Sequence, residues 1–548
     1  MNLKRILQLS SLSFVAFLST AAINSNSGDH NKYFEISKNI EIFANLFKEI
    51  NTYYVDDVDP GKLMRTGLDA MMNTLDPFTN YIAEADIEGY RSMTEGKYNG
   101  IGAQYKQIGD YITITELYEN CPAIKAGIKV GDLITAIEGK TTKGKSTDDV
   151  NNVMKGYPGS NVDLTVMREG KELKINLIRA EVDLPNVPYN GMLNEEIGYV
   201  NLTTFTQNAG GNVEKALREI REKNTKLKGI VLDLRENGGG LLNEAVNLCN
   251  IFVAKNEVIV TTKGKVVDWD KSYKTMGEPL DEKLPLVVLI NGNSASASEI
   301  VSGTIQDLDR GVVMGQLSYG KGLVQNTKDI GYNAKVKLTT AKYYIPSGRC
   351  IQAVTYKNGI PVHTPDSLRA VFRTRNGRTV LDGGGIKPDV LLEKPAQSNI
   401  AKNLLEKNII FDFVTQYCAK NPTIPAVDQF SFTGFTDFEQ FLSNKKFEYE
   451  TESEKMLKKM REEAIKEKYA DLLKVDFASL ESKIKNEKKS ELGQHKLEII
   501  DLIEREIVGR YYFHKGSVQM NLKNDAEVKA AIQLLNDLPK YNKILAKK

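Results

Sequence analysis

The stretch LVVLINGNSASASEIVSGTIQD spans residues 286–307 and joins an apolar segment to a run of small residues. PLVVLI predicts a buried strand that ends at Ile290, and the residues after it predict a helix that begins near Ser296. In an α/β protein, a serine where a strand meets a helix has an exposed hydroxyl beside free N–H groups that can stabilise an oxyanion. Ser294, Ser296 and Ser298 are the candidates, although the stretch does not fit the G-x-S-x-G turn of the α/β-hydrolases.

The same serines also have a purely structural interpretation. Ser296 followed three residues later by Glu299 matches a capping box, in which the serine caps the helix and the glutamate returns the bond. From this stretch alone, capping is favoured over catalysis. The choice depends on whether the rest of the chain supplies a base.

Histidine is scarce, so a Ser-His-Asp triad is disfavoured. The α/β region contains only His363, in the polar segment PVHTPDS. A lysine can replace histidine if burial lowers its pKa from about 10.4 to near 7, which costs roughly 4 to 5 kcal/mol. Lys321, in GQLSYGKGLVQNT, lies between two glycines, and Gln325 faces the same side four residues on. A solvated turn lysine is the alternative. The chain's histidines are His30, His363, His495 and His514.

Three consecutive glycines, Gly238 to Gly240, follow another predicted buried strand in GIVLDLRENGGG. Without a Cβ, such a run can present its N–H groups to an anion. A flexible turn or a phosphate cradle is the alternative interpretation. Because the chain has no G-x-x-x-x-G-K-[ST] motif, nucleotide binding is disfavoured.

The length of 548 residues and the changes in sequence pattern predict several domains. The 73 basic and 71 acidic residues nearly balance, which gives no electrostatic reason to expect a nucleic-acid partner. The four cysteines lie far apart, so neither a disulfide framework nor a cysteine metal site is expected. The pattern predicts a helical segment at 35–94, a β-rich domain at 95–182, an α/β core at 183–393 and a helical extension at 400–548.

The first 22 residues have the layout of a secretory signal peptide. A basic start with Lys4 and Arg5 precedes an apolar run to about Leu18, and small residues follow. We therefore expect an extracytoplasmic protein, in a periplasm after removal of residues 1–22. A retained membrane anchor is the alternative.

Several motifs together resemble the C-terminal processing (tail-specific) serine peptidases. They are LDLRENGGGLLNEAV, NSASASEIVSGTIQD, YGKGLVQ, YYIPSGRCIQ and GGIKPDV, and they occur in that family's order within residues 40–393. The resemblance implies a crotonase-like α/β peptidase core with an inserted PDZ domain and a Ser-Lys dyad. Carried over by position, Ser296 is the nucleophile, Lys321 the general base and Gln325 the residue that orients it.

The resemblance also implies an oxyanion hole made by the Ala297 N–H and one N–H of the glycine run. Gly240 is favoured for this role and Gly239 is close behind. Asp307 matches an acidic position that supports the site in some members of the family. Neither a metal nor a cofactor is implied.

Residues 95–182 resemble a PDZ domain, with YNGIGAQY where the carboxylate-binding loop stands. A loop with two glycines can turn successive N–H groups towards a terminal carboxylate, and an edge strand after it can pair with an extended peptide. The resemblance thus implies capture of a substrate's C-terminus by Gly100, Ile101, Gly102 and Ala103. A structural spacer or an autoinhibitory lid is the alternative.

These inferences predict an exported serine endopeptidase that acts on polypeptides bound by their C-terminal tail. One rival is a PDZ-containing binding or chaperone protein with a silent core, against which stands the presence of both Ser296 and Lys321. Another is an acyl-CoA enzyme of the crotonase type, against which stand the PDZ domain and the export signal. The helical segments are candidates for a homodimer contact.

Overall fold

The computed structural model describes residues 27–394 and 396–547, so the predicted signal peptide lies outside the described residues. Among these, residues 27–74 belong to one compact unit and those from Leu75 onward to a second. The described part of the first unit holds two helices, α2 (Ser27–Tyr53) and α3 (Pro60–Asn73). Asp59 caps α3 by accepting the N–H groups of Gly61 and Lys62. Within the described residues no helix is both long and apolar enough to cross a membrane.

The second unit is built around a six-stranded sheet in the order β10-β11-β12-β15-β16-β23. Strand β10 is antiparallel to β11, and the other neighbours are parallel, as their crossover helices require. The strands and these helices are β10 (Tyr189–Met192), β11 (Ile197–Asn201), α7 (Ala209–Lys223), β12 (Gly229–Asp233), α8 (Leu242–Phe252), β15 (Leu286–Ile290), α9 (Ala297–Asp307), β16 (Val312–Gly315) and β23 (Val390–Leu391).

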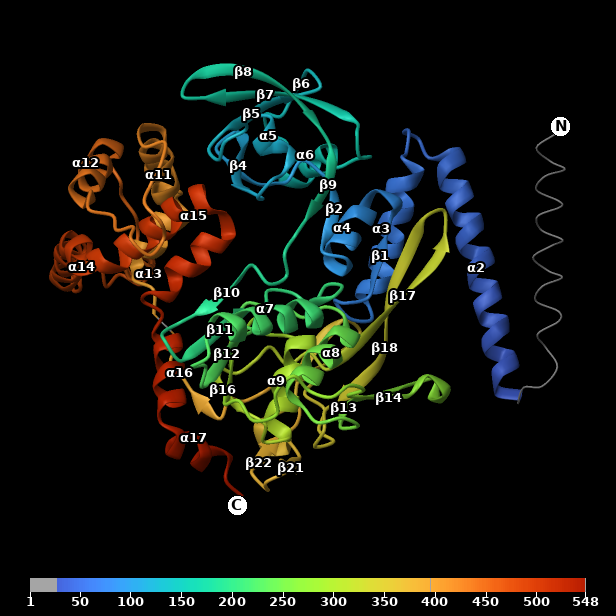
Figure 1. Ribbon diagram of the computed structural model, residues 1–548. Helices are drawn as coiled ribbons and strands as arrows, with labels where there is room; N and C mark the ends of the chain where they lie inside the picture. The colour runs from blue at the N-terminus through green and yellow to red at the C-terminus, as the bar shows by residue number, and fades with distance from the viewer. Residues whose placement is uncertain (1–26, 395, 548) are drawn as a thin grey trace. The chain divides into compact units, whose positions relative to one another are not determined.

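Both faces of this sheet are covered (Figure 1), which explains why the predicted strands are almost entirely apolar and do not alternate with polar residues. Leu232 and Val288 pack with α7, α8 and α9, whereas Val231 and Val287 pack with the chain's last helices, α16 (Ala526–Asn536) and α17 (Leu538–Leu545). The chain's end is therefore part of the core. The sequence prediction had assigned all of residues 400–548 to one helical extension.

A second sheet carries one wall of the site described below. Its order is β1-β18-β13-β14, and β17 also pairs with β18. The segment LDPFTNYI spans residues 75–82, and its end forms the edge strand β1. The elements here are β1 (Asn80–Ile82), η1 (Glu84–Asp86), α4 (Ile87–Thr94), β13 (Val258–Gly264), η2 (Val267–Trp269), β14 (Lys271–Lys274), β17 (Leu323–Gly331) and β18 (Ala334–Tyr344); the short hairpins β19 (Val354–Lys357)–β20 (Ile360–His363) and β21 (Val371–Arg373)–β22 (Thr379–Leu381) flank η3 (Asp366–Leu368).

The β-rich domain is inserted between two paired strands. Strand β2 enters it, β9 leaves it, and the two are antiparallel partners. Its own sheet has the order β3-β4-β5-β7-β8, which leaves β3 at an edge, and helix α6 lies against β3. The elements are β2 (Lys97–Gly100), β3 (Ala103–Ile108), β4 (Tyr111–Leu117), α5 (Pro122–Lys125), β5 (Leu133–Ile137), β6 (Lys140–Thr141), α6 (Thr147–Met154), β7 (Asn161–Arg168), β8 (Lys171–Ile178) and β9 (Ala180–Asp183).

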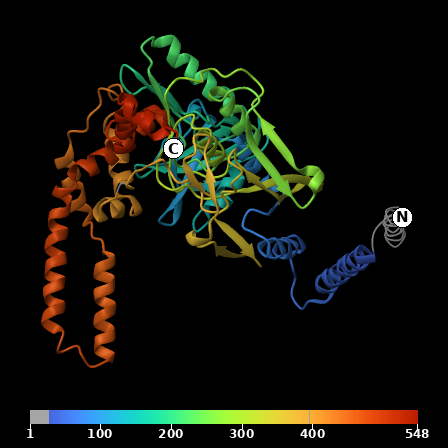
Figure 2. The ribbon, with the colours of Figure 1, turned by 90° about the horizontal axis from the view of Figure 1, so that it is seen from below.

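A helical region follows the α/β core in the chain and has its own apolar cluster, which includes Phe413 and Phe438. Helices α13 and α14 run side by side as a hairpin (Figure 2), and Arg461 on one pairs with Glu481 on the other at 2.8 Å. The helices are α10 (Asn399–Glu406), α11 (Ile409–Lys420), α12 (Phe435–Lys445), α13 (Glu452–Lys466), α14 (Lys474–Gln494) and α15 (Lys496–Leu522).

Candidate active site

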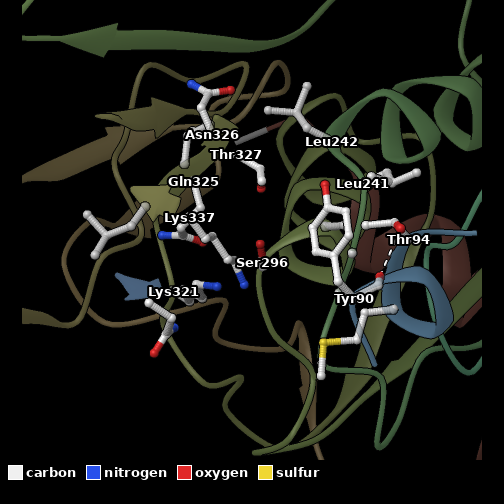
Figure 3. Close-up of a pocket in the computed structure, with 18 of the residues that line it drawn as sticks. Tyr90, Thr94, Leu241, Leu242, Ser296, Lys321, Gln325, Asn326, Thr327 and Lys337 are labelled. Carbon is white, nitrogen blue, oxygen red and sulfur yellow. Dashed lines mark hydrogen bonds between the residues drawn. The ribbon is translucent and has the colours of Figure 1, made fainter. Parts of the chain in front are cut away.

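Ser296, Lys321 and Gln325 line one pocket of about 910 Å³. Figure 3 shows their side chains directed into the same space, together with that of Lys337. Ser296 comes from the start of α9, Lys321 from the loop before β17, and Gln325 from β17 itself. The structure thus brings together the three residues for which the sequence predicts a dyad and its support.

The serine triplet separates into one pocket residue and two structural residues. The hydroxyls of Ser294 and Ser298 are fully buried and donate to the main-chain oxygens of Leu234 and Asn237, each at 2.8 Å. Ser296 lies between them, is partly exposed and faces the pocket. The outer serines therefore hold the loop after β12 against the middle serine, which alone can meet a substrate.

Ser296 is also the N-cap of α9 and forms the predicted capping box with Glu299. Its backbone has φ 55° and ψ −111°, a conformation that costs a non-glycine residue free energy and is held by its surroundings. The Glu299 carboxylate accepts the Ser296 N–H at 2.8 Å. Capping and catalysis are therefore compatible at this residue, and they do not compete as the sequence alone suggested.

The predicted oxyanion donors lie beside Ser296. Within the described part of the chain, neither the Ala297 N–H nor the Gly240 N–H has a hydrogen-bond partner, whereas the Gly239 N–H donates to Asn237 Oδ1 at 2.9 Å. Gly239 has φ +97°, and a Cβ there would lie 2.8 Å from the Ser296 Cβ. This geometry favours Gly240 as the donor and gives Gly239 the role of allowing close approach.

Lys321 is held in a sheltered position. Burial, together with the positive charge of Lys337, lowers its pKa to about 8, although the carboxylates of Glu299 and Asp76 act in the opposite direction. The main chain of Lys321 is fixed from two sides, because its N–H donates to Glu299 and its carbonyl oxygen accepts the Tyr343 hydroxyl at 2.7 Å. A sizeable fraction of the amine is therefore neutral near neutral pH, as a general base requires.

The segment before β1 provides the cover over Lys321, and the sequence analysis missed it. The Lys321 amine lies 4.4 Å from the centroid of the Phe78 ring. Asp76 holds this turn by accepting the N–H groups of Phe78 and Thr79 at 2.8 and 2.9 Å. An exposed-looking Pro-Phe turn carries little sequence signal, and only the fold places it on the lysine.

Gln325 lies in the pocket, but its side chain is hydrogen-bonded to a residue other than Lys321. Its Nε2 donates to Thr339 Oγ1 at 3.2 Å, and a bulge between Val324 and Gln325 interrupts the β17–β18 register. The assumption of a regular strand from Lys321 onward therefore fails, because Lys321 precedes β17. Orientation of the Lys321 amine by Gln325 stays a prediction.

Asp307 does not line the pocket. It is the last residue of α9, about 16 to 17 Å along the helix from Ser296 at about 1.5 Å per residue. Its carboxylate pairs with Arg349 at 2.8 Å and accepts the Ser347 N–H at 3.0 Å, with both charged side chains almost fully buried. These contacts are those of a structural ion pair that anchors the loop after β18. Any support of the site by Asp307 acts through that loop.

The predicted tail-binding residues connect β2 to β3 in the PDZ region. Gly100 ends β2 and Ala103 begins the edge strand β3. The Ile101 side chain is buried in the domain core, so only its main chain is available to a ligand. Gly102 has φ +82°, and a Cβ there would lie 2.1 Å from the Cys121 Cβ. The loop therefore requires glycine at this position.

Three further residues in or beside the pocket were not assigned to the site from the sequence. Glu299 was interpreted only as a capping residue, and neither Lys337 nor Tyr343 was assigned a role. A charged Glu299 inside the apolar SEIVSGTI helix was the one available signal, since an unpaired charge in a buried helix is rarely tolerated. Alternation in β18 could not separate Lys337 from Lys335.

The assembled groups suit acyl transfer. They are the Ser296 hydroxyl, the sheltered Lys321 amine, the Ala297 N–H at the start of α9 and the Gly240 N–H of the glycine run. The pocket wall next to them is mostly apolar. Its apolar members include Ile82, Met93, Leu241, Leu242, Ile300, Leu323 and Val324.

Comparison with known proteins places these features in one family. Residues 196–363 match the model of peptidase family S41, residues 99–178 that of the PDZ domain, and residues 400–535 that of the probable PDZ-protease C-terminal helical domain. These matches confirm the predicted peptidase core and the predicted PDZ domain.

Among similar proteins, the carboxy-terminal-processing protease of Bartonella bacilliformis is 35% identical over 345 residues, which cover 62% of this chain and 78% of that protein. A probable CtpA-like serine protease of Staphylococcus aureus is 31% identical over 355 residues, 64% of this chain and 70% of that one. A solved structure of a photosystem II D1 C-terminal processing protease is 26% identical, covers 64% of this chain and 92% of that chain, and has a TM-score of 0.35. The chain belongs to the carboxy-terminal-processing proteases of peptidase family S41.

Proposed function

We propose that this protein is an exported endopeptidase that cleaves polypeptides with a Ser296-Lys321 dyad after its PDZ domain has bound their C-terminal tail. The observation that carries the proposal is the shared pocket, in which a sheltered lysine amine and a partly exposed serine hydroxyl face the same space. Donors for the oxyanion that forms in the reaction are also present: the N–H groups of Ala297 and Gly240, which have no acceptor among the residues that the structure describes.

In the first half of the reaction, neutral Lys321 takes the proton of the Ser296 hydroxyl as its oxygen attacks the carbonyl carbon of the scissile bond. The resulting oxyanion accepts hydrogen bonds from Ala297 and Gly240, at the positive end of α9. Lys321 then gives the proton to the leaving nitrogen, and the bond between that nitrogen and the carbonyl carbon breaks. An ester of Ser296 remains.

In the second half, water attacks the ester carbonyl and Lys321 accepts its proton. The oxyanion forms at the same two N–H groups and then collapses, releasing the new carboxylate and the Ser296 oxygen, which regains a proton from Lys321. One base thus serves both halves, and no further titratable side chain is needed at the serine.

The pocket indicates what the dyad accepts. Leu241, Leu242 and Ile300 stand next to Ser296 on the wall of the pocket, so an apolar substrate side chain gains hydrophobic contact near the scissile bond. An extended, unfolded segment is the form of substrate that can enter from an open cleft.

Tail capture rests on the loop from Gly100 to Ala103 and on the edge strand β3. The N–H groups of the loop suit a terminal carboxylate, and an extended peptide can add to the free side of β3. Export is proposed from the sequence pattern of residues 1–22, which leads us to expect a periplasmic protein.

A homodimer through helical segments is proposed as well. Several large apolar side chains of α2 are exposed within its own unit, which favours a contact that covers them. They are Phe34, Ile36, Ile40, Ile42, Phe43 and Leu46. Sedimentation of the mature chain and of a Phe43→Glu variant would show a dimer that the substitution dissociates; a wild-type monomer would contradict this proposal.

The function is tested with one unstructured polypeptide in two forms, one with a free apolar C-terminus and one with the same C-terminus amidated. Wild type is expected to cleave the free form with the lower KM, while Ser296→Ala and Lys321→Ala cleave neither. Ser294→Ala serves as the matched control and is expected to retain cleavage. Equal cleavage by wild type and both dyad variants would refute the dyad, and equal KM for the two polypeptides would refute tail capture.

A silent binding protein is the second candidate, and the same assay separates it. In that case the wild type would bind the free tail without cleaving it.

A further inference from the structure

Glu299 joins the two halves of the dyad. It is 0% exposed, although it is a carboxylate in the first turn of α9. Its Oε2 accepts the N–H of Ser296 at 2.8 Å and the N–H of Lys321 at 2.9 Å. One oxygen atom therefore fixes the main chain of the nucleophile and the main chain of the base, although these residues come from different segments.

The other oxygen of Glu299 fixes the rest of the Lys321 loop. Oε1 accepts the Gly320 N–H at 2.7 Å and also the Ser318 hydroxyl. Ser318 in turn accepts the Ile386 N–H at 2.6 Å, which ties the loop to the segment before β23. A carboxylate offers about four acceptor sites, so these four donors use its full capacity. No other residue type of this size accepts four hydrogen bonds.

This carboxylate goes beyond what a helix cap requires. A capping box needs one hydrogen bond from the N-cap N–H, which Ser296 supplies. Three of the four bonds instead reach residues 318–321, on the far side of β16 in the sequence. Burial of a charge is costly unless it is fully hydrogen-bonded, and here the bonds are made to the loop of the base.

We infer that Glu299 is a positioning residue that sets the distance between the Ser296 hydroxyl and the Lys321 amine. This inference rests on the proposed dyad. Glu299 contacts neither the substrate nor the reacting atoms. It acts because its carboxylate binds both the N-cap turn at Ser296 and the loop at Gly320 and Lys321. A displacement of about 1 Å between reacting groups lowers a rate by about 100-fold, so loss of this link affects kcat before KM.

The charge of Glu299 gives the inference a second readout. Three charged groups act on the proton affinity of the Lys321 amine from the elements packed around it: Lys337 of β18, Asp76 of the turn before β1, and Glu299 of α9. The negative charge of Glu299 raises the pKa of Lys321. Glu299→Gln removes this charge, whereas Glu299→Asp keeps it and only shortens the link.

The experiment measures kcat and KM between pH 6 and 10 on the unstructured polypeptide, with wild-type cleavage and inactive Ser296→Ala established first. For both Glu299→Gln and Glu299→Asp we expect kcat to fall about 100-fold with KM within threefold. The acidic limb of the profile is the low-pH range in which kcat rises as Lys321 loses its proton. It is expected to move to lower pH in Glu299→Gln only. Wild-type kcat in either variant, or an unmoved limb in Glu299→Gln, would overturn the inference while leaving the dyad intact.

Glu527→Gln is the matched control. Glu527 is also a buried glutamate in the first turn of a helix, α16. It is hydrogen-bonded to Arg235 and Gln316, and none of these three residues lines the pocket. Its loss is expected to lower the melting temperature without moving the acidic limb. A limb that moves equally in Glu527→Gln would refute a specific role for Glu299.

Ser318→Ala covers the case in which neither Glu299 variant folds. It removes one donor to Glu299 and leaves the carboxylate charged. We expect kcat about tenfold lower, an unchanged KM and an unmoved limb. Wild-type kcat in Ser318→Ala would then overturn the inference.

Discussion

The Lys321 amine lies 4.4 Å from the centroid of the Phe78 ring, so a residue from the turn before β1 covers the base of a dyad more than 200 positions further along the chain. The ring acts in two ways. Its π-face favours a charged amine, while its bulk keeps water away and favours a neutral one. Burial is the largest cause of the lowered pKa of Lys321, so the second effect prevails.

Phe78→Ala is therefore expected to raise the pKa of Lys321 towards its usual value of 10.5. The acidic limb of kcat/KM moves to higher pH, and activity at pH 7 falls about tenfold for each pH unit of that movement. Phe78→Leu keeps the cover and removes the π-face, so its limb is expected to stay or to move to lower pH. Downward movement in both variants would show that the aromatic face, not the cover, has the larger effect on the pKa of Lys321.

Lys337 gives a second prediction about the same limb. Its positive charge lowers the pKa of Lys321, and both amines line one pocket. Lys337→Met is expected to move the acidic limb to higher pH and to reduce kcat/KM at pH 7 by roughly two- to fivefold. Lys335→Met is the control, since Lys335 is on the same strand but pairs with Asp329. A limb that does not move in Lys337→Met would contradict this prediction.

The serine triplet predicts opposite results for stability and activity. Ser294→Ala and Ser298→Ala each remove a buried hydroxyl and its hydrogen bond to a main-chain oxygen, which costs about 0.5 to 1.5 kcal/mol of unfolding free energy. Both are expected to melt at lower temperature and to retain cleavage. Ser296→Ala is expected to lose cleavage with little change in melting temperature. An active Ser296→Ala would exclude this serine as the nucleophile.

The buried lysine also predicts a pH-dependent stability. Because its pKa is lowered from 10.5 to about 8, folding is disfavoured by about 3 kcal/mol below pH 8, and this cost disappears as the pH rises through 8 to above 10.5. Lys321→Met is therefore expected to be more stable than wild type at pH 7, with a difference that shrinks towards pH 10.5. Urea unfolding at pH 7 and pH 10 measures it. Equal stability at pH 7 would show that Lys321 is not desolvated.

Much of this site could be predicted from the sequence because it depends on local patterns. The segments GIVLDL and PLVVLI are almost entirely apolar, which predicts strands buried on both faces, and they form β12 and β15. The helix start after β15 placed Ser296 at an N-cap, and the glycine run indicated a close approach of the main chain. The family motifs then identified Lys321 and Gln325.

The remaining features depend on contacts between segments far apart in the chain. Nothing in the local sequence of Phe78 indicates that it covers a lysine, and nothing local to α16 shows that it packs under β12. Glu299 was visible as half of a capping box, but its bonds to residues 318–321 appear only when the loop folds back onto α9. The bulge at Gln325 likewise follows from the pairing of β17 with β18.

The central claim, that Lys321 is the base for Ser296, is tested most directly by the pH dependence of kcat/KM for cleavage of the unstructured polypeptide. The account predicts a single acidic limb with a pKa of about 8, which is absent in Lys321→Ala because that variant does not cleave. A limb near 6.5, typical of histidine, or cleavage that persists in Lys321→Ala would contradict it.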